Sequence, residues 1–331
     1  MFAMIIEETG GPEVLKMAEV ATPEPGPGQV RVRIACAGVN PADWKNRQGM
    51  LAMYRPYVFP YVIGFDAAGL VDKLGPGVTG LAVGDRVFTP TNHGQGGWGS
   101  YAECAIADAD RVAKMPATLR YEQAAALPVA TLTAWQALFD RGGLDVSNAS
   151  GKRVMIHGGA GGLGGFAVQF ARWAGARVAA TCSTANVEYL QSLGVERVID
   201  YRSEDITAAV TAWAPGGLDY LMDAVGVSTL PNGLDLVRTG GTFVSIPTLV
   251  DDGDIPAAAA AGAARGVNRV FSTMTDAGCA PTLAQIAQLV VDGHVRLPPL
   301  RVLPLAEAAE AHRLSQTGHV RGKMVLRVAD L

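Results

Sequence analysis

A run of glycines at residues 158–164 is the part of this sequence whose composition points most directly to chemistry. Gly159, Gly161 and Gly164 fit the pattern G-x-G-x-x-G, with an apolar strand predicted before it and a helix predicted after it. There, glycine allows a tight turn, a close approach of backbone to pyrophosphate, and close packing of helix on strand. The free N–H groups of the helix N-terminus would then face phosphate. A tight turn without a ligand is the alternative, but the context favours a dinucleotide cradle. The predicted cradle consists of Gly159, Ala160, Gly161, Gly162, Leu163 and Gly164.

The end of the next predicted strand bears on which dinucleotide is bound. It reads Thr-Cys-Ser-Thr-Ala-Asn over residues 181–186 and carries no carboxylate. Sites for NAD place Asp or Glu at this point to hold the ribose 2′-hydroxyl. Small hydroxyl and amide groups such as those of Ser183 and Asn186 leave room for a 2′-phosphate, so the sequence favours NADPH. The same residues also suit the start of a helix near Asn186, and the two roles are compatible.

The elements that position this cradle follow from the alternation of apolar strands and amphipathic helices after residue 121. Such alternation, with continuous apolar strands, predicts a parallel sheet covered on both faces. Strands are expected at 153–157, 176–181, 197–200, 218–223 and 241–246, and helices at 163–174, 186–193 and 204–213.

Residues 1 to about 125 differ in character, because short apolar or alternating runs are separated by Gly and Pro. Many short strands at close spacing predict a sandwich or a small barrel. In the last 60 residues, 282–293 are expected to form a helix and 323–328 a strand. The alanine-rich stretch 257–264 is expected to be a helical turn or a loose surface segment.

The overall composition excludes several classes of protein. The chain has 331 residues, 49% of them hydrophobic and 18% charged, which suits folded domains and not disorder. A formal net charge of −4, with no long run of one sign, argues against a nucleic-acid binder and a polybasic membrane anchor. There is no signal-peptide pattern, no run of 18 apolar residues and no paired cysteine motif. These features predict a cytoplasmic protein.

Several motifs, in order along the chain, carry a resemblance to a known family. They are Gly-Val-Asn-Pro-Ala-Asp-Trp-Lys at 38–45, Ile-Gly-Phe-Asp-Ala-Ala-Gly at 63–69, Val-Gly-Asp-Arg-Val at 83–87, Leu-Pro-Val-Ala-Thr-Leu-Thr-Ala at 127–134, the glycine run, Val-Ile-Asp-Tyr at 198–201, Asp-Ala-Val-Gly at 223–226 and Gly-Lys-Met-Val-Leu at 322–326. The chain resembles the zinc-independent quinone oxidoreductases (ζ-crystallin-like) of the medium-chain dehydrogenase/reductase superfamily, and is similar also to alkenal reductases. The resemblance implies an α/β fold with a GroES-like β-rich catalytic domain at 1–124, completed by 272–331, and a Rossmann doubly wound parallel-sheet domain at 125–271.

The resemblance also predicts that the protein holds no zinc. Zinc-dependent relatives carry Cys where this chain has Asn40, and Gly-His-Glu where it has Gly64, Phe65 and Asp66. Where those relatives place four cysteines for a structural zinc, this chain has only Cys104. A phenylalanine cannot ligate metal, and a catalytic zinc needs three protein ligands. Without a Lewis acid, hydride is best used on an activated acceptor, namely a quinone or an α,β-unsaturated carbonyl.

The family also implies roles for individual residues. Asn40 is expected near the nicotinamide and the substrate, and Val129 and Thr131 beside the nicotinamide ring and ribose. Ser183 and Tyr201 are expected at the 2′-phosphate, although several relatives have a lysine there where this chain has Val187. Val225, Ile246 and Pro247 are expected to line the cofactor from later strand ends, and Phe271 and Thr273 to reach it from the domain junction.

Three catalytic candidates follow: Asn40, Tyr54 and Lys45. Tyr54 lies in a loop at 49–60 that resembles the family's substrate lid, where a phenol could donate a proton or stack on an acceptor. Tyr57 and Tyr61 compete for that role, and each tyrosine could instead pack on the surface. Lys45 could contact substrate or cofactor, or be an ordinary solvated lysine.

Other polar residues are expected to be structural. His93 is expected to be a loop residue, and Asp66 to anchor the turn at Gly64. His157, at the end of the first nucleotide strand, is expected to be satisfied by backbone groups.

Three functions remain open at this point. The first is an NADPH-dependent reductase of a small-molecule quinone, enone or enal. The second is an enoyl reductase acting on acyl thioesters, and the third is a ζ-crystallin-like protein that binds NADPH with little turnover. Residues 268–273 are expected to form an edge strand that pairs across a two-fold axis, which predicts a homodimer.

Overall fold

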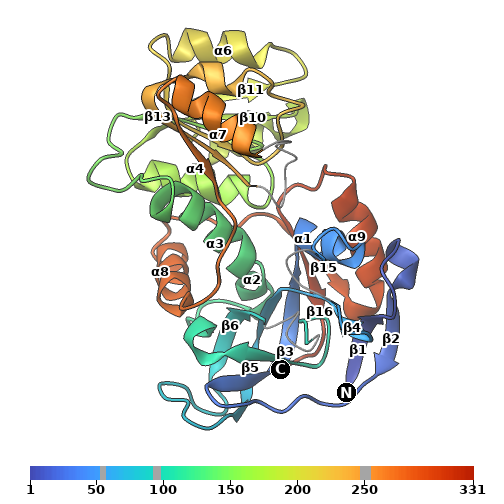
Figure 1. The fold of residues 1–331 in the computed structure, drawn as a ribbon. Helices are drawn as coiled ribbons and strands as arrows, with labels where there is room; N and C mark the ends of the chain where they lie inside the picture. The colour runs from blue at the N-terminus through green and yellow to red at the C-terminus, as the bar shows by residue number, and fades with distance from the viewer. Residues whose placement is uncertain (53–56, 92–97, 247–254) are drawn as a thin grey trace. The chain divides into compact units, whose positions relative to one another are not determined.

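The computed structural model describes residues 1–52, 57–91, 98–246 and 255–331. The chain divides into two units: residues 1–132, 275–293 and 297–331 form the first, and residues 133–274 and 294–296 form the second. Figure 1 follows the chain through both units. The domain limits expected from the sequence stay a prediction. Of the helices in the described ranges, none is long and apolar enough to cross a membrane.

The first unit is built mainly from β-strands. Its larger sheet has the order β15 (Leu300–Pro304), β16 (Lys323–Arg327), β3 (Gln29–Val39), β5 (Asp66–Leu74), β6 (Arg86–Pro90) and β8 (Ala113–Lys114), with β7 (Cys104–Asp108) also paired to β3. A second sheet has the order β2 (Lys16–Glu19), β1 (Phe2–Ile6) and β4 (Tyr61–Val62). The strand β16 lies antiparallel to β3, so that the C-terminal segment completes a sheet begun near the N-terminus.

Helices pack against these sheets in the first unit. They are α1 (Pro41–Arg47), α2 (Tyr121–Ala125), α8 (Ala280–Val291) and α9 (Ala308–Gln316), and α3 (Pro128–Trp135) begins there and ends in the second unit. The helix α1 starts directly after β3 because Asn40 is its N-cap and Pro41 its first residue. The Asp43 carboxylate accepts a hydrogen bond from the Asn40 backbone N–H at 2.6 Å, which fixes this first turn.

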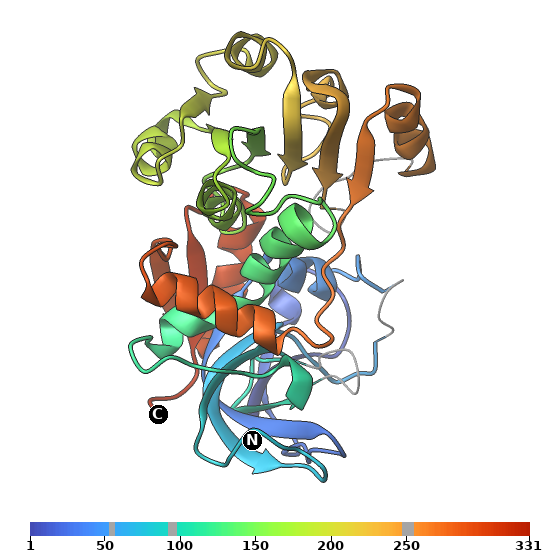
Figure 2. The ribbon, with the colours of Figure 1, turned by 90° about the vertical axis from the view of Figure 1, so that its left-hand side faces the viewer.

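The second unit contains one parallel sheet. Its order is β11 (Arg197–Asp200), β10 (Arg177–Cys182), β9 (Arg153–His157), β12 (Leu218–Asp223), β13 (Val237–Ser245) and β14 (Asn268–Phe271), and every neighbouring pair is parallel. This is the doubly wound order of dinucleotide-binding folds. Its helices include α4 (Gly164–Trp173), α5 (Val187–Ser192), α6 (Ile206–Trp213) and α7 (Ile255–Ala264). In Figure 2 the yellow-to-orange arrows of β12, β13 and β14 all end at the same edge.

The structure confirms the predicted strands of the second unit and extends one of them. The strands at 197–200 and 218–223 are found with the expected limits. The strand β13 begins at Val237, before the expected 241, because Val237 already pairs with Leu218 ahead of a register shift. The alanine-rich stretch belongs to the helix α7, which lies beside β14 (Figure 1).

Candidate functional site

The carboxyl edge of the parallel sheet gathers most of the residues predicted to bind a cofactor. The glycine run follows β9, Ser183 follows β10 and Tyr201 follows β11. Val225 lies just beyond β12, Ile246 follows β13, and Phe271 ends β14. Because β9 is flanked by β10 on one side and β12 on the other, the glycine run lies at the point where the strand order reverses. Ligands of open α/β sheets bind at this switch point.

The glycines of the run are required for different reasons. A Cβ built on Gly164 would lie 2.1 Å from the carbonyl oxygen of Gly158, and one on Gly159 would lie 2.7 Å from the Cβ of Ala180. These two glycines therefore allow close packing of backbone and strand. A Cβ on Gly161 would meet only the Gly158 oxygen, at 3.5 Å, so Gly161 borders open space. Glycine at such a position lets a ligand approach the backbone, and the cradle therefore fits a pyrophosphate.

A buried histidine holds the start of this cradle. Thr229 donates its hydroxyl proton to the carbonyl oxygen of Gly226, so it accepts the N–H of His157 Nε2 at 2.9 Å. Nδ1 of the same ring is then an acceptor, 2.8 Å from the hydroxyl of Thr181, which also accepts the Gly158 N–H. Burial lowers the pKa of His157, in keeping with a neutral ring. The expectation that backbone groups satisfy this histidine was wrong, because two threonine hydroxyls do so.

The residues predicted to bind the 2′-phosphate lie on two neighbouring loops, which follow β10 and β11. The Asn186 amide donates to the Ser183 hydroxyl at 3.2 Å, and Tyr201 is 47% exposed. Asp200 accepts the backbone N–H of Arg202 at 3.0 Å, and a hydrogen bond from Thr184 lowers the pKa of Asp200. The side chain of Arg202 is exposed. The Asp200 carboxylate is therefore already bonded to groups of both loops.

The remaining predicted cofactor residues of the second unit have varied surroundings. Val225 is exposed, and its N–H donates to the Asp223 carboxylate at 2.8 Å, whereas Ile246 is fully buried. Phe271 lies under the Arg269 guanidinium at 4.5 Å, and the Thr273 carbonyl accepts a hydrogen bond from Arg141. Pro247 lies outside the described residues.

In the first unit, Asn40 belongs to a buried cluster with Asp66 and Lys323. The Asn40 amide nitrogen donates to the Asp66 carboxylate at 2.8 Å, and the Lys323 ammonium donates to the Asn40 amide oxygen at 2.5 Å. Lys323 also donates to the carbonyl oxygen of Val39 at 3.0 Å. The other oxygen of Asp66 accepts the backbone N–H of Val129 at 2.9 Å. The expectation that Asp66 anchors the Gly64 turn was wrong, because its carboxylate joins two predicted cofactor residues instead.

A second chain of buried polar groups continues from the backbone of Asn40. The Asp43 carboxylate that accepts the Asn40 N–H also accepts the Tyr101 hydroxyl, at 3.3 Å. Tyr101 accepts from His312 Nε2 at 3.2 Å, since Nδ1 of that ring faces the Arg47 guanidinium at 3.2 Å and must accept. Burial, with a contribution from the Asp66 charge, raises the pKa of Asp43 to about 8. Burial and the Arg47 charge lower the pKa of His312 to about 3.

The other candidate residues of the first unit contact residues close to them. Thr131 is fully buried, and its hydroxyl donates to the Leu127 carbonyl at 2.7 Å. The Lys45 ammonium lies 5.6 Å from the centre of the Trp44 ring, and burial lowers its pKa. Asn46 is bound by Tyr57 and itself donates to Tyr61. The first-choice proton donor, Tyr54, lies outside the described residues, as does His93.

Sequence reasoning missed Lys323, His312 and Arg47 as members of the buried cluster around Asn40. Lys323 stands in the quoted C-terminal motif, where its type alone could have signalled a partner for Asp66. His312 and Arg47 carry no local signal, because their contact spans 265 positions of the chain.

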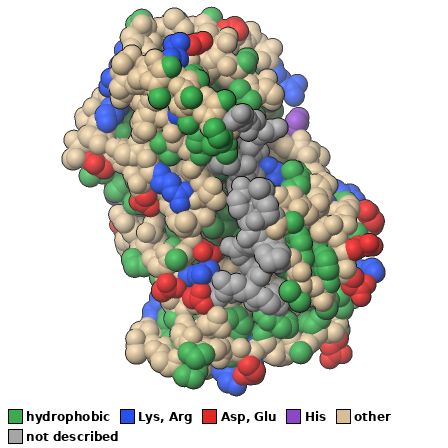
Figure 3. All heavy atoms as spheres, viewed as in Figure 1, with side chains coloured by type: hydrophobic (Ala, Val, Ile, Leu, Met, Phe, Trp, Pro, Cys, Tyr) green, Lys and Arg blue, Asp and Glu red, His purple; other side chains and the backbone are tan. Residues whose placement is uncertain are grey.

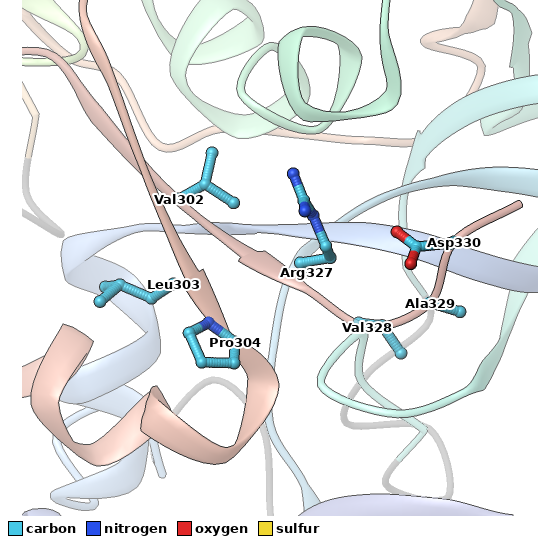
Figure 4. A pocket seen from close by; sticks show the side chains of 7 residues that line it. All are labelled: Val302, Leu303, Pro304, Arg327, Val328, Ala329 and Asp330. Atoms are coloured by element: carbon cyan, nitrogen blue, oxygen red, sulfur yellow. The ribbon is translucent and has the colours of Figure 1, made fainter.

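Two further surface features do not point to a site. A groove between β15 and the C-terminal segment is lined by Val302, Leu303, Pro304, Arg327, Val328, Ala329 and Asp330 (Figure 4). It contains none of the predicted site residues, and its Arg327 is paired with Glu122 at 2.9 Å. On the face seen in Figure 3, basic and acidic side chains are interspersed.

No group of three His, Cys, Asp or Glu side chains among the described residues is placed to hold a metal ion. At the positions where zinc relatives carry ligands, this chain has the hydrogen-bonded pair of Asn40 and Asp66.

Family models match both parts of the chain. The one described as an alcohol dehydrogenase GroES-like domain matches residues 26–117, and the one described as a zinc-binding dehydrogenase matches residues 193–326.

Individual relatives agree with these models. The chain is 32% identical to a chloroplast envelope quinone oxidoreductase homolog of Arabidopsis thaliana, over 96% of this chain and 95% of the relative. It is 31% identical to a mitochondrial NAD(P)H oxidoreductase of Homo sapiens, over 99% of this chain and 89% of the relative.

Solved structures match nearly the whole length of the chain. A quinone oxidoreductase from Coxiella burnetii matches with a TM-score of 0.88 and 32% identity, over 99% of each chain. A mycobacterial protein solved in complex with NADPH matches with a TM-score of 0.85 and 29% identity, over 99% of this chain and 100% of that one. The CurK enoyl reductase matches with a TM-score of 0.84 and 26% identity, over 99% of each chain.

The parallel sheet with its glycine cradle and the β-rich unit with its Asn40 cluster thus occur together in the order that these relatives share. The chain belongs to the zinc-independent quinone oxidoreductase family of the medium-chain dehydrogenase/reductase superfamily, and is an oxidoreductase that uses NAD(P)H on a small-molecule substrate.

Proposed function

We propose that the protein is an NADPH-dependent reductase of quinones or α,β-unsaturated carbonyls. The choice of NADPH over NADH rests on the residues after β10, where Ser183 and Asn186 stand in place of a carboxylate. The exposed guanidinium of Arg202, at the end of the adjacent strand, adds a positive charge suited to a 2′-phosphate. These groups compensate for the lysine that relatives carry where this chain has Val187.

Backbone N–H groups of the glycine run are the proposed contacts of the pyrophosphate. The backbone N–H groups of Ala160, Gly162 and Leu163 have no hydrogen-bond partner within the described residues. Such N–H groups at the start of a helix suit phosphate oxygens. The proposed cofactor-binding residues are Asn40, Val129, Thr131, Gly159, Ala160, Gly161, Gly162, Leu163, Gly164, Ser183, Asn186, Tyr201, Val225, Ile246, Pro247, Phe271 and Thr273.

The chemistry proposed for this chain is a reduction by two electrons. Bound NADPH supplies the hydride. For an enone, hydride adds at the β-carbon and a proton follows at the α-carbon, while a quinone is reduced to the hydroquinone. The chain must stabilise negative charge on the acceptor oxygen, and Asn40 has one amide N–H left for this after its bond to Asp66. Tyr54 is the proposed proton donor, and Lys45 is proposed to contact the substrate or the cofactor.

Oxidation of NADPH and NADH by the purified protein tests this proposal, with a quinone, an enone and an enoyl thioester as acceptors. We expect a higher kcat/KM with NADPH than with NADH, and turnover of the quinone or the enone. Turnover of the thioester alone would favour the enoyl reductase function, which the likeness to the CurK enoyl reductase supports. Tight NADPH binding without turnover of any acceptor would favour the ζ-crystallin-like binding protein.

Further proposals concern the organisation and location of the protein. We propose functional domains at 1–124 with 272–331 and at 125–271, and a homodimer formed along β14. This strand is the last in the order of its sheet, and unprotected edges pair readily. A monomer by light scattering would refute the dimer. A cytoplasmic location also stays a prediction, to be tested by fractionation, since relatives are named as chloroplast and mitochondrial proteins.

A further inference from the structure

We propose that Asp66 and Lys323 are positioning residues, which hold the Asn40 carboxamide in one orientation and leave one of its N–H bonds as the donor to an acceptor oxygen. The proposal rests on the proposed function for the identity of that oxygen, the carbonyl of a quinone or enone. The orientation itself rests only on the contacts of the first unit.

The two neighbours of the Asn40 amide have opposite hydrogen-bonding characters. Lys323 donates to Val39 and to Asn40, so the amide atom that faces the ammonium is the oxygen. Asp66 accepts on both carboxylate oxygens, from Asn40 and from the Val129 N–H, so the amide atom that faces the carboxylate is the nitrogen. A flipped amide would set N–H bonds against the ammonium and its oxygen against the carboxylate. Only one orientation is therefore compatible with both neighbours.

The fold brings the three side chains together from distant parts of the sequence. In the large sheet, Met324 pairs with Val39 and Asp66 pairs with Gly38, which places Lys323 and Asp66 beside the start of α1. Asp66 is fully buried and Lys323 is 4% exposed, with their charged atoms 3.9 Å apart. Burial raises the pKa of Asp66 and lowers that of Lys323, and in each case the charge of the other opposes the shift.

A buried ion pair of this kind is poor evidence for stability, because desolvation offsets the attraction between the charges. Its value here is orientation. One N–H of the Asn40 amide is bonded to Asp66, and the second has no partner within the described ranges. A fixed N–H aimed at developing negative charge accelerates a reaction without reorganisation cost. Asp66 additionally fixes the Val129 N–H, so one carboxylate orders two of the residues proposed to meet the nicotinamide.

An exchange of side chains between positions 40 and 66 separates orientation from folding. The single variant N40D sets two carboxylates side by side, so we expect lower thermal stability and a lower kcat. The double variant N40D/D66N restores one carboxylate, one amide and the lysine, but leaves no N–H at position 40. We expect it to regain the melting temperature of the wild type, while kcat stays about 100-fold lower, the usual loss for one oxyanion donor.

A second measurement does not depend on turnover. The side-chain amide of Asn40, assigned in ¹⁵N NMR spectra by its loss in N40D, should give one slowly exchanging pair of proton signals. In D66N the carboxylate that fixes the amide is replaced, and we expect faster proton exchange or a second set of signals. The matched control is K114M, which removes an exposed lysine paired with Asp85 in the same unit and should leave the signals unchanged.

The two measurements distinguish the possible failures. Wild-type kcat in N40D/D66N, or an unchanged Asn40 amide signal in D66N, would overturn the positioning roles. Absence of turnover in the wild type with every acceptor would overturn the proposed function instead, and the NMR comparison would still decide the orientation of Asn40.

Discussion

The proposed ligand-binding groups of the two units are held in place in different ways. The cradle of the second unit consists of backbone at positions where a side chain would not fit, since a Cβ at Gly164 would lie 2.1 Å from a carbonyl oxygen. The cluster of the first unit is made of ionisable side chains that are almost entirely buried, among them Asp43, Asp66, His312 and Lys323. The cradle should therefore be sensitive to added volume, and the cluster to changes in charge.

The sharpest test of the cradle compares two of its glycines. We expect G164V to prevent stable folding of the second unit, because backbone rather than a flexible side chain fills the space beside Gly164. By contrast, G161A should keep the melting temperature within a few degrees and weaken NADPH binding about 10-fold or more, since its methyl group enters the open side of the run. Thermal unfolding and NADPH titration measure both effects. Equal loss of stability in the two variants would contradict the division of roles between these glycines.

Charge removal provides the corresponding test of the cluster. The substitution K323M leaves the Asp66 carboxylate buried without its counter-charge, and we expect a loss of about 3–5 kcal/mol in the free energy of unfolding. The control K114M breaks an exposed pair, in which Lys114 is 59% exposed, and should cost under about 1 kcal/mol. Denaturant unfolding of both variants measures the difference. Similar losses would mean that the buried charges of the cluster matter no more than surface charges.

The same contrast explains what the sequence could predict. The cradle is local: a strand, six residues and a helix follow one another, so spacing alone indicated a dinucleotide-binding turn. The parallel sheet was predictable for the same reason, because its strands are built around short apolar runs such as Val154, Met155 and Ile156. The cluster is not local, since Lys323 meets Asn40 across 283 positions. No periodicity reports such a contact, so Asp66 was assigned to its own turn and Arg47 and His312 were missed.

Cofactor preference tests the loop after β10. In S183D a carboxylate stands where NAD-dependent relatives of the fold hold the ribose 2′-hydroxyl, and it would repel a 2′-phosphate. We expect the ratio of kcat/KM for NADPH to that for NADH to fall by about 10-fold to 100-fold, equivalent to about 1.4–2.8 kcal/mol. The control S192D adds the same charge on α5, away from the strand ends, and should leave the ratio unchanged. An unchanged ratio in S183D would remove Ser183 from the proposed 2′-phosphate site.

Acid should unfold the protein partly through His312. Its pKa is about 3 in the folded chain against an ordinary value of 6.5, so the unfolded chain binds more protons between these values. The stability tied to the neutral ring is complete above pH 6.5 and is lost as the pH falls towards 3. In H312Q the decline of the melting temperature below about pH 6.5 should be shallower than in the wild type. The exposed His294 provides the control, and H294Q should follow the wild-type curve.

Asp43 should have the opposite pH dependence, because its raised pKa makes the folded chain lose stability as the pH rises. Its pKa rises from 3.8 to about 8 on folding, so the folded chain binds more protons between these values and stability falls as the pH rises through them. In D43N an uncharged amide oxygen can still accept from the Asn40 N–H and the Tyr101 hydroxyl, without the cost of a buried charge. The melting temperature of D43N relative to the wild type should therefore increase from about pH 5 to about pH 8 and then level off. The exposed Asp330 provides the control, and D330N should show no such trend. A constant difference between D43N and the wild type would mean that Asp43 is ionised throughout this range, and that the Lys323 charge and the hydrogen bonds from Asn40 and Tyr101 outweigh its burial.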